Sequence, residues 1–429
     1  MAFTLFIVAI FLLIFGAPIA ICLGLGAAAA FFFSGSMPLL IVPQRMFGGT
    51  DSFPLMAIPF FVLAGNLMAA GGISKRLIAF ANTLTGHITG GLAICSVLGG
   101  MFFAAISGSG AATTAALGSI LIPAMVLKGY NREFSGAVQA CSGAIGIIIP
   151  PSIPMVLYGV GACVSIGDLF MGGFGPGIVM GLCLMITSYF ISRKDGYGGR
   201  EKRSNFREIG KAFKDSILAL FMPVIILGGI YAGVFTPTEA AVVAVVYGYI
   251  VSAWIYRELD FKGVQKALSS TVITSAIIMF IIGCAAIFAV VLTREKIPQQ
   301  IAATLLSLSK NPIVLLMIIN VFLLFIGAIM ETAAALIILT PILVPIVLAV
   351  GINPVHFGVV MVTNLGIGLV TPPVGINLYV AASISGSRME PLAKRAIPLL
   401  AAMVVALLII SYVPQLTLYP VELLNSLRN

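Results

Sequence analysis

The sequence predicts an all-α membrane protein that crosses the bilayer many times and contains an internal repeat. Its 429 residues are 60% hydrophobic and only 9% charged, with a mean hydropathy of +1.16, whereas soluble globular proteins average about 25% charged residues. The apolar segments are continuous over roughly 20 residues each, the length of a membrane-spanning helix. They lack the short alternating pattern of a transmembrane β-barrel, which excludes that class.

Hydropathy predicts ten spans outside two longer stretches. The N-terminal MAFTLFIVAIFLL has no basic residues before its apolar run, so we interpret it as a first membrane helix and not as a signal peptide. The six cysteines are dispersed through apolar segments without a CxxC pair, as is typical of small buried side chains. The predicted spans are 3–22, 24–43, 53–72, 134–163, 170–192, 216–235, 238–257, 268–293, 356–386 and 396–415.

Two longer apolar stretches, 87–127 and 311–350, have polar interruptions near their midpoints. The first is interrupted by Ser107-Gly108-Ser109-Gly110, and the second around Gly327 and Met330-Glu331-Thr332. Such a stretch forms either two spans or one hairpin that enters and leaves on the same side. The two alternatives predict different sides for the loops that follow.

The loop charges favour the hairpins. With the N-terminus outside and both stretches folded as hairpins, eighteen of the 23 Lys and Arg residues face the cytoplasm. The other five, which face outward, are Arg45, Arg294, Lys296, Lys310 and Arg428. This is a strong positive-inside bias. If 87–127 formed two passes, the basic segment 193–214 would move outside, and the bias would be lost. The same spread of charge over short loops gives no support to a nucleic-acid partner.

A repeat joins the two stretches. Residues 109–158 align with 331–380 at a constant offset of 222, and 14 of the 50 positions are identical, including Pro150-Pro151 and Pro372-Pro373. Five passes separate the predicted hairpin tips, and an odd number inverts the second copy. An inverted repeat with helices broken by Gly and Pro is typical of secondary transporters, whose solute and ion sites lie at the breaks.

The breaks predict cation sites. Glycine and proline release the backbone from helical hydrogen bonding, and free carbonyls inside a membrane need protein, water or a ligand as partner. Together with Ser, Thr and Asn oxygens they are suitable ligands for Na⁺. The alternative is that the breaks are packing kinks. The predicted sodium ligands are Ser107, Gly108, Ser109, Ser142, Gly143 and Gly146 in the first repeat, and Gly327, Thr332, Gly366, Gly368 and Thr371 in the second.

The same region predicts a site for an anionic solute, because the N-termini of half-helices attract negative charge. Glu331 is an ionisable group at membrane depth, which by default indicates function; the alternative is an acid that accepts from free amides at a helix start. Glu239, in Thr236-Pro237-Thr238-Glu239, is interpreted as part of a structural capping box. The separate His87 and His356 do not suggest a metal or catalytic pair. The predicted solute contacts are Ser109, Gly110, Pro151, Glu331, Thr332, Asn364 and Pro373.

Four motifs also resemble a known family. GVFTPTEAA at 233–241, SGSGAATTAALGSILIP at 107–123, IGIIIPPSIPMVLYG at 145–159 and VTPPVGINLYVA at 370–381 are similar to the large membrane subunit of tripartite ATP-independent periplasmic (TRAP) transporters, the DctM-like family. The resemblance implies an elevator-type, Na⁺-driven transporter in the bacterial inner membrane. It implies two partners, a small four-helix membrane subunit, expected as a separate chain, and a periplasmic binding protein that delivers an organic acid.

This resemblance implies a scaffold and a mobile transport domain. The segments 74–86 and 296–311 mix polar and apolar residues and are expected to be interfacial helices, with plain loops as the alternative. The predicted parts are a first scaffold part at 1–86, transport repeat 1 at 87–192 (hairpin 87–127, broken helix 134–163), a cytoplasmic connecting loop at 193–215, a second scaffold part at 216–310, transport repeat 2 at 311–395 (hairpin 311–350, broken helix 356–386), and a C-terminal helix and tail at 396–429.

Three other functions compete with a TRAP subunit. A stand-alone sodium–dicarboxylate symporter of the same broad fold would need no binding protein. An ATP-driven permease is disfavoured because the chain has no P-loop, and an intramembrane hydrolase would need paired acids or a Ser/His pair at one depth. We therefore expect neither an enzyme nor a cofactor other than the coupling Na⁺. C4-dicarboxylates and acidic sugars such as sialic acid both fit the solute that the resemblance implies.

The charge pattern generates a topology prediction. Cysteines introduced at Gly196 and Ser426, in a background without the natural cysteines, should react with an impermeant thiol reagent from opposite sides of the membrane. The reason is that the positive-inside bias places 193–215 in the cytoplasm and both termini outside. Labelling of the two positions from the same side would contradict the inverted repeat.

Overall fold

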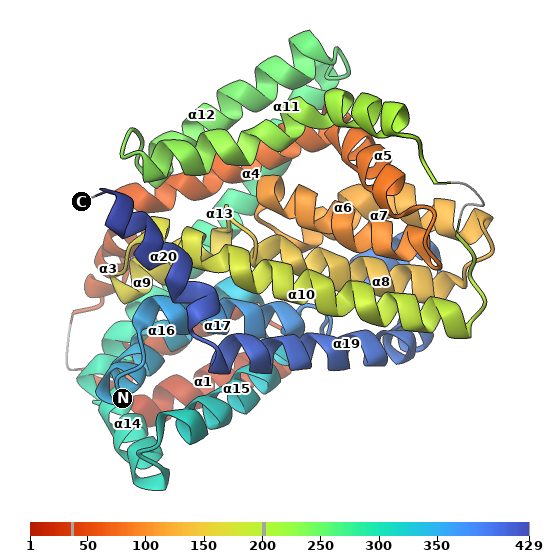
Figure 1. Cartoon of the computed structure of the whole chain (residues 1–429). Helices are drawn as coiled ribbons and strands as arrows, with labels where there is room; N and C mark the ends of the chain where they lie inside the picture. The colour runs from red at the N-terminus through yellow and green to blue at the C-terminus, as the bar shows by residue number, and fades with distance from the viewer. Residues whose placement is uncertain (36–37, 200–202, 429) are drawn as a thin grey trace.

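The computed structural model describes residues 1–35, 38–199 and 203–428, and the regular structure within these ranges is entirely helical (Figure 1). This confirms the predicted all-α membrane class. Nine helices of this part of the chain are long and apolar enough to cross a membrane. Arg200 and Lys202, counted above among the cytoplasmic charges, lie outside the described residues.

The N-terminal spans 3–22 and 24–43 were predicted wrongly. The chain forms three shorter helices there, α1 (Ala2–Ile14), α2 (Ile19–Ser34) and α3 (Ile41–Thr50). Gly16 has a φ of 76°, and Pro18 is the N-cap of α2, so the first apolar run contains a sharp turn. α1 and α2 pack against each other as a helical pair. Hydropathy averages over this turn because its residues are themselves apolar.

The first predicted hairpin and broken helix coincide with separate helices in the structure. α6 and α7 meet around Gly108, and α8 and α9 are separated by a break that includes the Pro150-Pro151 pair. The segment 74–86 is helical, so the loop alternative was wrong there. The elements are η1 (Phe53–Met56), α4 (Ala57–Ala70), α5 (Ile73–Thr85), α6 (Gly91–Ser107), α7 (Gly110–Leu127), α8 (Arg132–Ala144), η2 (Ile145–Ile147), α9 (Ile153–Ala162) and α10 (Ile166–Lys194).

The second half repeats this pattern and corrects two boundaries. Half of the predicted loop 193–215 is helical, because α11 begins within it, and the predicted tail after 415 is a further helix. The segment 296–311 is also mainly helical. The elements are α11 (Phe206–Tyr231), α12 (Pro237–Tyr249), the π-helical η3 (Ile250–Ile255), α13 (Phe261–Arg294), α14 (Ile297–Leu308), α15 (Pro312–Ile329), α16 (Thr332–Ala349), α17 (Pro354–Gly368), α18 (Ile376–Ser385), α19 (Met389–Tyr412) and α20 (Gln415–Arg428).

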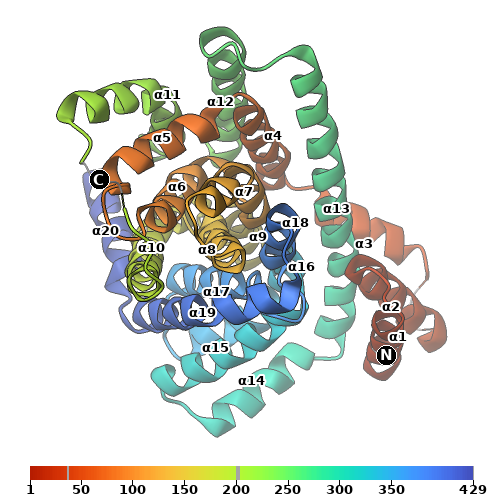
Figure 2. The ribbon, with the colours of Figure 1, turned by 90° about the vertical axis from the view of Figure 1, so that its right-hand side faces the viewer.

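The helices form a central group and an arc around it. Figure 2 shows α6–α9 beside α15–α19 in the centre, with α5, α11, α12, α4, α13 and α14 arranged around them. We call these outer helices the frame and the central helices the body. α1–α3 lie beyond α13. The largest wholly buried aromatic side chains include Phe103, Phe134, Tyr158 and Phe357 in the body and Phe61 on α4 of the frame, so the hydrophobic core extends from the body into the frame.

The two hairpins begin at opposite ends of α19. At the start of α19, Arg395 pairs with Asp195 at the end of α10 at 3.2 Å. α6 begins at this same end, where Gly90 donates its N–H to the Tyr197 carbonyl at 3.0 Å. At the other end of α19, the Tyr412 hydroxyl donates to a carbonyl in the first turn of α15 at 3.2 Å. The two hairpins therefore enter the body from opposite ends.

One ion pair joins α5 to the rest of the frame. Arg76 on α5 contacts Glu258 at 2.7 Å, and its guanidinium lies 3.7 Å from the centre of the Tyr256 ring. Stacking and pairing together suit a planar guanidinium. Because α5 connects α4 to α6, this contact fixes the base of the first hairpin against the frame.

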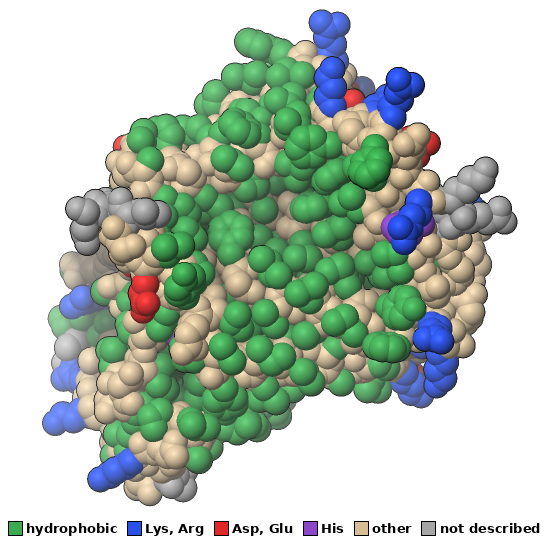
Figure 3. Space-filling model, viewed as in Figure 1, with side chains coloured by type: hydrophobic (Ala, Val, Ile, Leu, Met, Phe, Trp, Pro, Cys, Tyr) green, Lys and Arg blue, Asp and Glu red, His purple; other side chains and the backbone are tan. Residues whose placement is uncertain are grey.

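The surface is that of a membrane protein. Hydrophobic side chains cover most of the face in Figure 3, and Lys and Arg lie near its edges. α13 exposes Val272 and Ile273, and α15 exposes Phe325. Soluble monomers rarely expose large contiguous apolar patches.

Candidate functional site

The first hairpin tip is a two-residue turn rich in hydroxyl groups. Gly108 has a positive φ of 60°, and Ser109 caps α7 by accepting from Ala112 N at 3.5 Å. The Ser107 hydroxyl lies 2.7 Å from that of Thr113, which donates to the Ser109 carbonyl at 2.8 Å. The sequence predicted Ser107 and Ser109 for this site but not Thr113, which lies one helical turn further along α7.

This tip rests on the break in the first broken helix. Ile153, the first residue of α9, donates its N–H to the Gly108 carbonyl at 3.3 Å. A Cβ on Gly108 would lie 2.8 Å from the Pro151 carbonyl oxygen, and one on Gly146 would lie 2.7 Å from that of Ser109. Side chains at these glycines would separate the two backbones. The predicted residues Gly108, Ser109, Gly146 and Pro151 are therefore brought together.

The second tip uses the equivalent position for capping. Glu331, at an offset of 222 from Ser109, accepts from Ala333 N at 2.8 Å and from Ala334 N at 3.1 Å at the start of α16. This is the capping alternative that the sequence left open, in which the carboxylate accepts hydrogen bonds from N–H groups at the helix start. Thr332, the first residue of α16, is buried.

The second tip also rests on its own break. Val374 donates its N–H to the Ala328 carbonyl at 3.2 Å. A Cβ on Gly368 would lie 2.4 Å from the Gly327 carbonyl oxygen. The Thr371 hydroxyl, predicted as a cation ligand, donates to the Ile367 carbonyl at 2.8 Å and keeps its lone pairs. Pro373, predicted to contact the solute, is exposed to solvent.

Two predicted site residues hold the broken helices to the hairpins. The Ser142 hydroxyl donates to the Ser96 carbonyl on α6 at 2.7 Å. Asn364, at an offset of 222 from Ser142, donates from its amide to the Asn320 carbonyl on α15 at 3.0 Å. Both side chains thus bond the first arm of their own hairpin. These bonds give both side chains a structural role, and the Asn364 amide oxygen has no hydrogen-bond partner among the described residues.

The two repeats meet at glycines. A Cβ on Gly366 would lie 3.2 Å from the Ile147 side chain in the first break, and one on Gly143 would lie 2.9 Å from the Gly110 carbonyl. Gly110 is also close to the second repeat, because a Cβ there would lie 3.2 Å from the Asn377 amide nitrogen. Breaks and tips of both repeats therefore form one compact region.

A cavity of about 610 Å³ lies between the first tip and the frame. Ser107, Ser109 and Ala112 line its body side, and the frame side includes Asn66 and Lys266. Of the predicted solute contacts, Ser109 alone lines it among the residues that the structure describes. The full lining is Val62, Gly65, Asn66, Ala69, Ala70, Phe103, Ser107, Ser109, Ala111, Ala112, Ala115, Ala116, Ile153, Gly263, Lys266, Ala267, Ser270 and Thr274.

Sequence reasoning missed the frame side of this cavity. Lys266, Ser270 and Thr274 recur every four residues on α13, which places them on one helix face. This polar stripe at the start of an otherwise apolar span was the available signal. Asn66 was a further one, since it lies inside a predicted span; its amide donates to the Thr271 hydroxyl at 3.0 Å.

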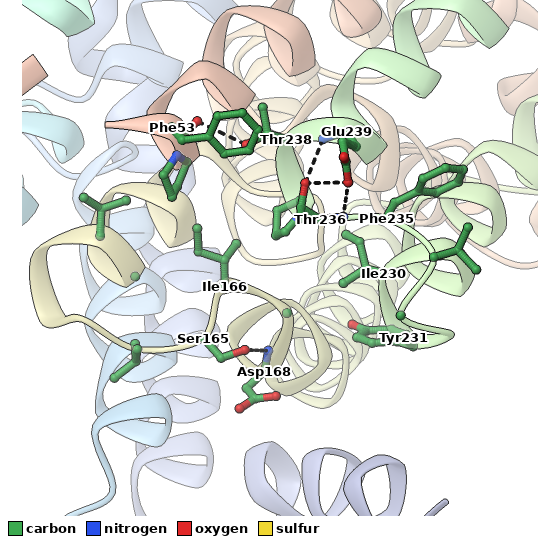
Figure 4. Close-up of a pocket in the computed structure, with 18 of the residues that line it drawn as sticks. Phe53, Ser165, Ile166, Asp168, Ile230, Tyr231, Phe235, Thr236, Thr238 and Glu239 are labelled. Carbon is green, nitrogen blue, oxygen red and sulfur yellow. Dashed lines mark hydrogen bonds between the residues drawn. The ribbon is translucent and has the colours of Figure 1, made fainter. Parts of the chain in front are cut away.

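A larger cleft of about 690 Å³ lies between the loop preceding α12 and the start of α10 (Figure 4). Thr236 and Glu239 form the predicted capping box there, with the Thr236 N–H donating to the carboxylate at 2.8 Å. Asp168 is in the first turn of α10, capped by Ser165 at 3.1 Å. This cleft contains neither hairpin tip, so volume alone does not identify the site. Within the described ranges, no cluster of His, Cys, Asp and Glu could hold a metal.

Comparison with known proteins gives a consistent family. The family described as tripartite ATP-independent periplasmic transporter, DctM component, matches residues 6–416. The isethionate TRAP transporter permease protein DctMQ of Oleidesulfovibrio alaskensis is 49% identical over 95% of this chain, which spans 64% of that relative's length. The sialic acid TRAP transporter large permease protein SiaM of Vibrio cholerae is 41% identical over 96% of each chain. The C4-dicarboxylate large permease protein DctM of Pseudomonas aeruginosa is 42% identical over 92% of each.

Solved structures agree on the fold. The YdaH transporter of Alcanivorax borkumensis superimposes with a TM-score of 0.62 at 15% identity, covering 87% of this chain and 88% of that one. MtrF of Neisseria gonorrhoeae gives 0.59 at 16% identity, over 86% and 84%. At this level of identity the likeness concerns the fold alone.

The contact between tip and break generates a prediction. Gly368→Ala should lower the thermal unfolding midpoint of the purified protein and reduce transport, because its methyl group would meet the Gly327 carbonyl. Forced overpacking typically costs about 1–3 kcal/mol. Gly228→Ala on α11 is the matched control, since a Cβ there meets no atom within 4 Å. Equal unfolding midpoints for the two variants would contradict the close approach.

Proposed function

This chain belongs to the DctM family of tripartite ATP-independent periplasmic transporters, and from this membership we propose that it imports an organic acid across the bacterial inner membrane. It is a multi-pass permease subunit and not an enzyme. The named relatives transport isethionate, sialic acid or C4-dicarboxylates. All three solutes are anions of small organic acids, so the proposed solute class is an acid with a carboxylate or sulfonate group.

The cavity between the first tip and the frame is the observation that most supports this proposal. Lys266 is the one charged side chain among its described lining residues. Tip hydroxyls and the Asn66 amide offer hydrogen bonds to the same space. A single cation facing hydroxyl groups suits a monoanionic or dianionic acid. The acid would lie between Ser109 and Lys266.

We propose Na⁺ as the coupling ion. The residues at both tips fit this cation, because backbone carbonyls and hydroxyls converge there. Ser107, Ser109 and the carbonyls around Gly143 would hold one ion. Thr371 with the carbonyls at Gly327 and Gly368 would hold its counterpart.

An elevator movement of the body against the frame is the proposed mechanism. The contact between them supports it, because α4 presents small residues to the tip. A Cβ on Gly65 would lie 3.2 Å from Ser107 Cα, and Ala69 and Ala70 continue the same lining. Two hairpins that enter from opposite ends can travel together without drawing charged loops through lipid. Solute and ions would then move with the tips.

A reconstituted system tests the function. The chain would be placed in proteoliposomes with its small membrane subunit, and the uptake of labelled isethionate, succinate and sialic acid measured. We expect uptake of one of these acids to require both an inward Na⁺ gradient and the periplasmic binding protein. Dependence on Na⁺ should be sigmoidal if two ions are coupled. Uptake without the binding protein would indicate a stand-alone symporter instead, and uptake driven only by a pH gradient would contradict Na⁺ coupling.

Lys266 provides a sharper prediction about the solute. Lys266→Gln should weaken the apparent affinity for the acid by about two- to fivefold, the range expected for a partly exposed charge pair. The measurement is the half-saturating solute concentration in exchange assays. Lys262→Gln is the matched control, since Lys262 lies one turn away on α13 and does not line the cavity.

The same variant separates two mechanisms. Lys266 belongs to the frame, so a solute that travels with the body would contact it in only one of the two end states. The affinity change should therefore appear from one side of the membrane only, as measured in vesicles of each orientation. An equal change from both sides would indicate a fixed site with alternating gates.

A further inference from the structure

Asn377 links the two repeats at the first tip. It is the second residue of α18, in the second repeat, and its side chain is wholly buried. Its amide nitrogen donates to the Ala140 carbonyl on α8, in the first repeat, at 3.2 Å. Its amide oxygen has no hydrogen-bond partner among the described residues. A buried acceptor without a partner is costly, so this oxygen points to a ligand.

The Asn377 amide lies beside the start of α7 and the end of α8 in the first repeat. A Cβ on Gly110 would lie 3.2 Å from the Asn377 amide nitrogen and 3.3 Å from the Gly143 carbonyl oxygen. The Thr114 hydroxyl donates to the Gly110 carbonyl at 3.0 Å, so its lone pairs remain available. The oxygens near the Asn377 amide are therefore the carbonyls of Gly110 and Gly143 and the Thr114 hydroxyl, and the Leu369 side chain lies beside them. This is a set of hard oxygen ligands without a carboxylate, which suits a monovalent cation.

We propose that Asn377 supplies an oxygen ligand to the first Na⁺ site, so that this site is completed by both repeats. The proposal rests on the Na⁺ coupling proposed above. At an offset of 222 the equivalent residue is Met155, which has no oxygen in its side chain. The second site thus lacks this ligand. The two sites differ in affinity, and the first binds Na⁺ more tightly.

The test uses the purified complex with its small membrane subunit. Its thermal unfolding midpoint would be measured over a range of Na⁺ concentrations at constant ionic strength, with K⁺ as the replacement. Asn377→Leu, which keeps the branched shape and removes the oxygen, should raise the Na⁺ concentration for half-maximal stabilisation by about tenfold. The Na⁺ dependence of uptake should become less sigmoidal in the same variant.

Asn320→Leu is the matched control. Asn320 is also buried, but both of its amide groups are bonded: its nitrogen to the Ser411 hydroxyl at 2.9 Å, and its oxygen to the Asn364 amide at 3.1 Å. We expect this variant to unfold at a lower temperature at every Na⁺ concentration, with the half-maximal concentration unchanged. Asn377→Asp keeps an oxygen and adds a charge, so it should lower the half-maximal Na⁺ concentration even if the leucine variant does not fold.

The outcomes separate the two proposals. If the wild-type complex responds to Na⁺ and both Asn377 variants respond equally, the oxygen is occupied by a water molecule only and the assignment is wrong. If Na⁺ changes neither the unfolding midpoint nor the uptake of the wild-type complex, the proposed Na⁺ coupling is wrong. The role proposed for Asn377 is then wrong as well, because it rests on that coupling.

Discussion

A helix that breaks inside a membrane leaves backbone N–H and C=O groups without partners, and lipid offers none. In the part of the chain that the structure describes, the breaks between α8 and α9 and between α17 and α18 each receive a hairpin tip. Ile153 N bonds the Gly108 carbonyl in one repeat, and Val374 N bonds the Ala328 carbonyl in the other. The tips are themselves chain reversals that need burial. Each hairpin and its broken helix therefore stabilise each other, and neither is expected to persist alone.

The remaining architecture follows from this mutual burial. Two tips and two breaks meet through glycines such as Gly110 and Gly366, which lie close to residues of the other repeat. The helices that carry them form one body. The frame then needs only to cover the sides of that body, and the Arg76–Glu258 pair fixes the connection from α4 to the first hairpin. The proposed solute site lies where the body faces the frame, between Ser109 and Lys266.

Much of this arrangement was predictable because glycine and proline mark the positions at which a membrane helix breaks. The repeat placed both tips and both breaks, and the TPTE motif placed a capping box. Side-chain roles were harder to predict. Ser142 and Asn364 each bond a hairpin arm, and Glu331 caps α16. The turn at Gly16 was not predicted, because its neighbours are apolar and the hydropathy of the segment 3–22 is that of a single span. The role of Asn377 could not be predicted for a different reason. Its hydrogen-bond partner, Ala140, is 237 positions away in the sequence.

The small residues along α4 have a practical consequence. Gly65, Ala69 and Ala70 leave little side-chain bulk on much of the face toward the tip, and Val62 and Asn66 are the larger side chains on it. The cavity of about 610 Å³ lies along this face of α4. A rigid molecule shaped to fill it would act as a wedge, touching Asn66 on the frame and Ala112 on the body at once. Such a compound would arrest transport without resembling the solute, and resistance to it would arise by enlarging the alanines on either side.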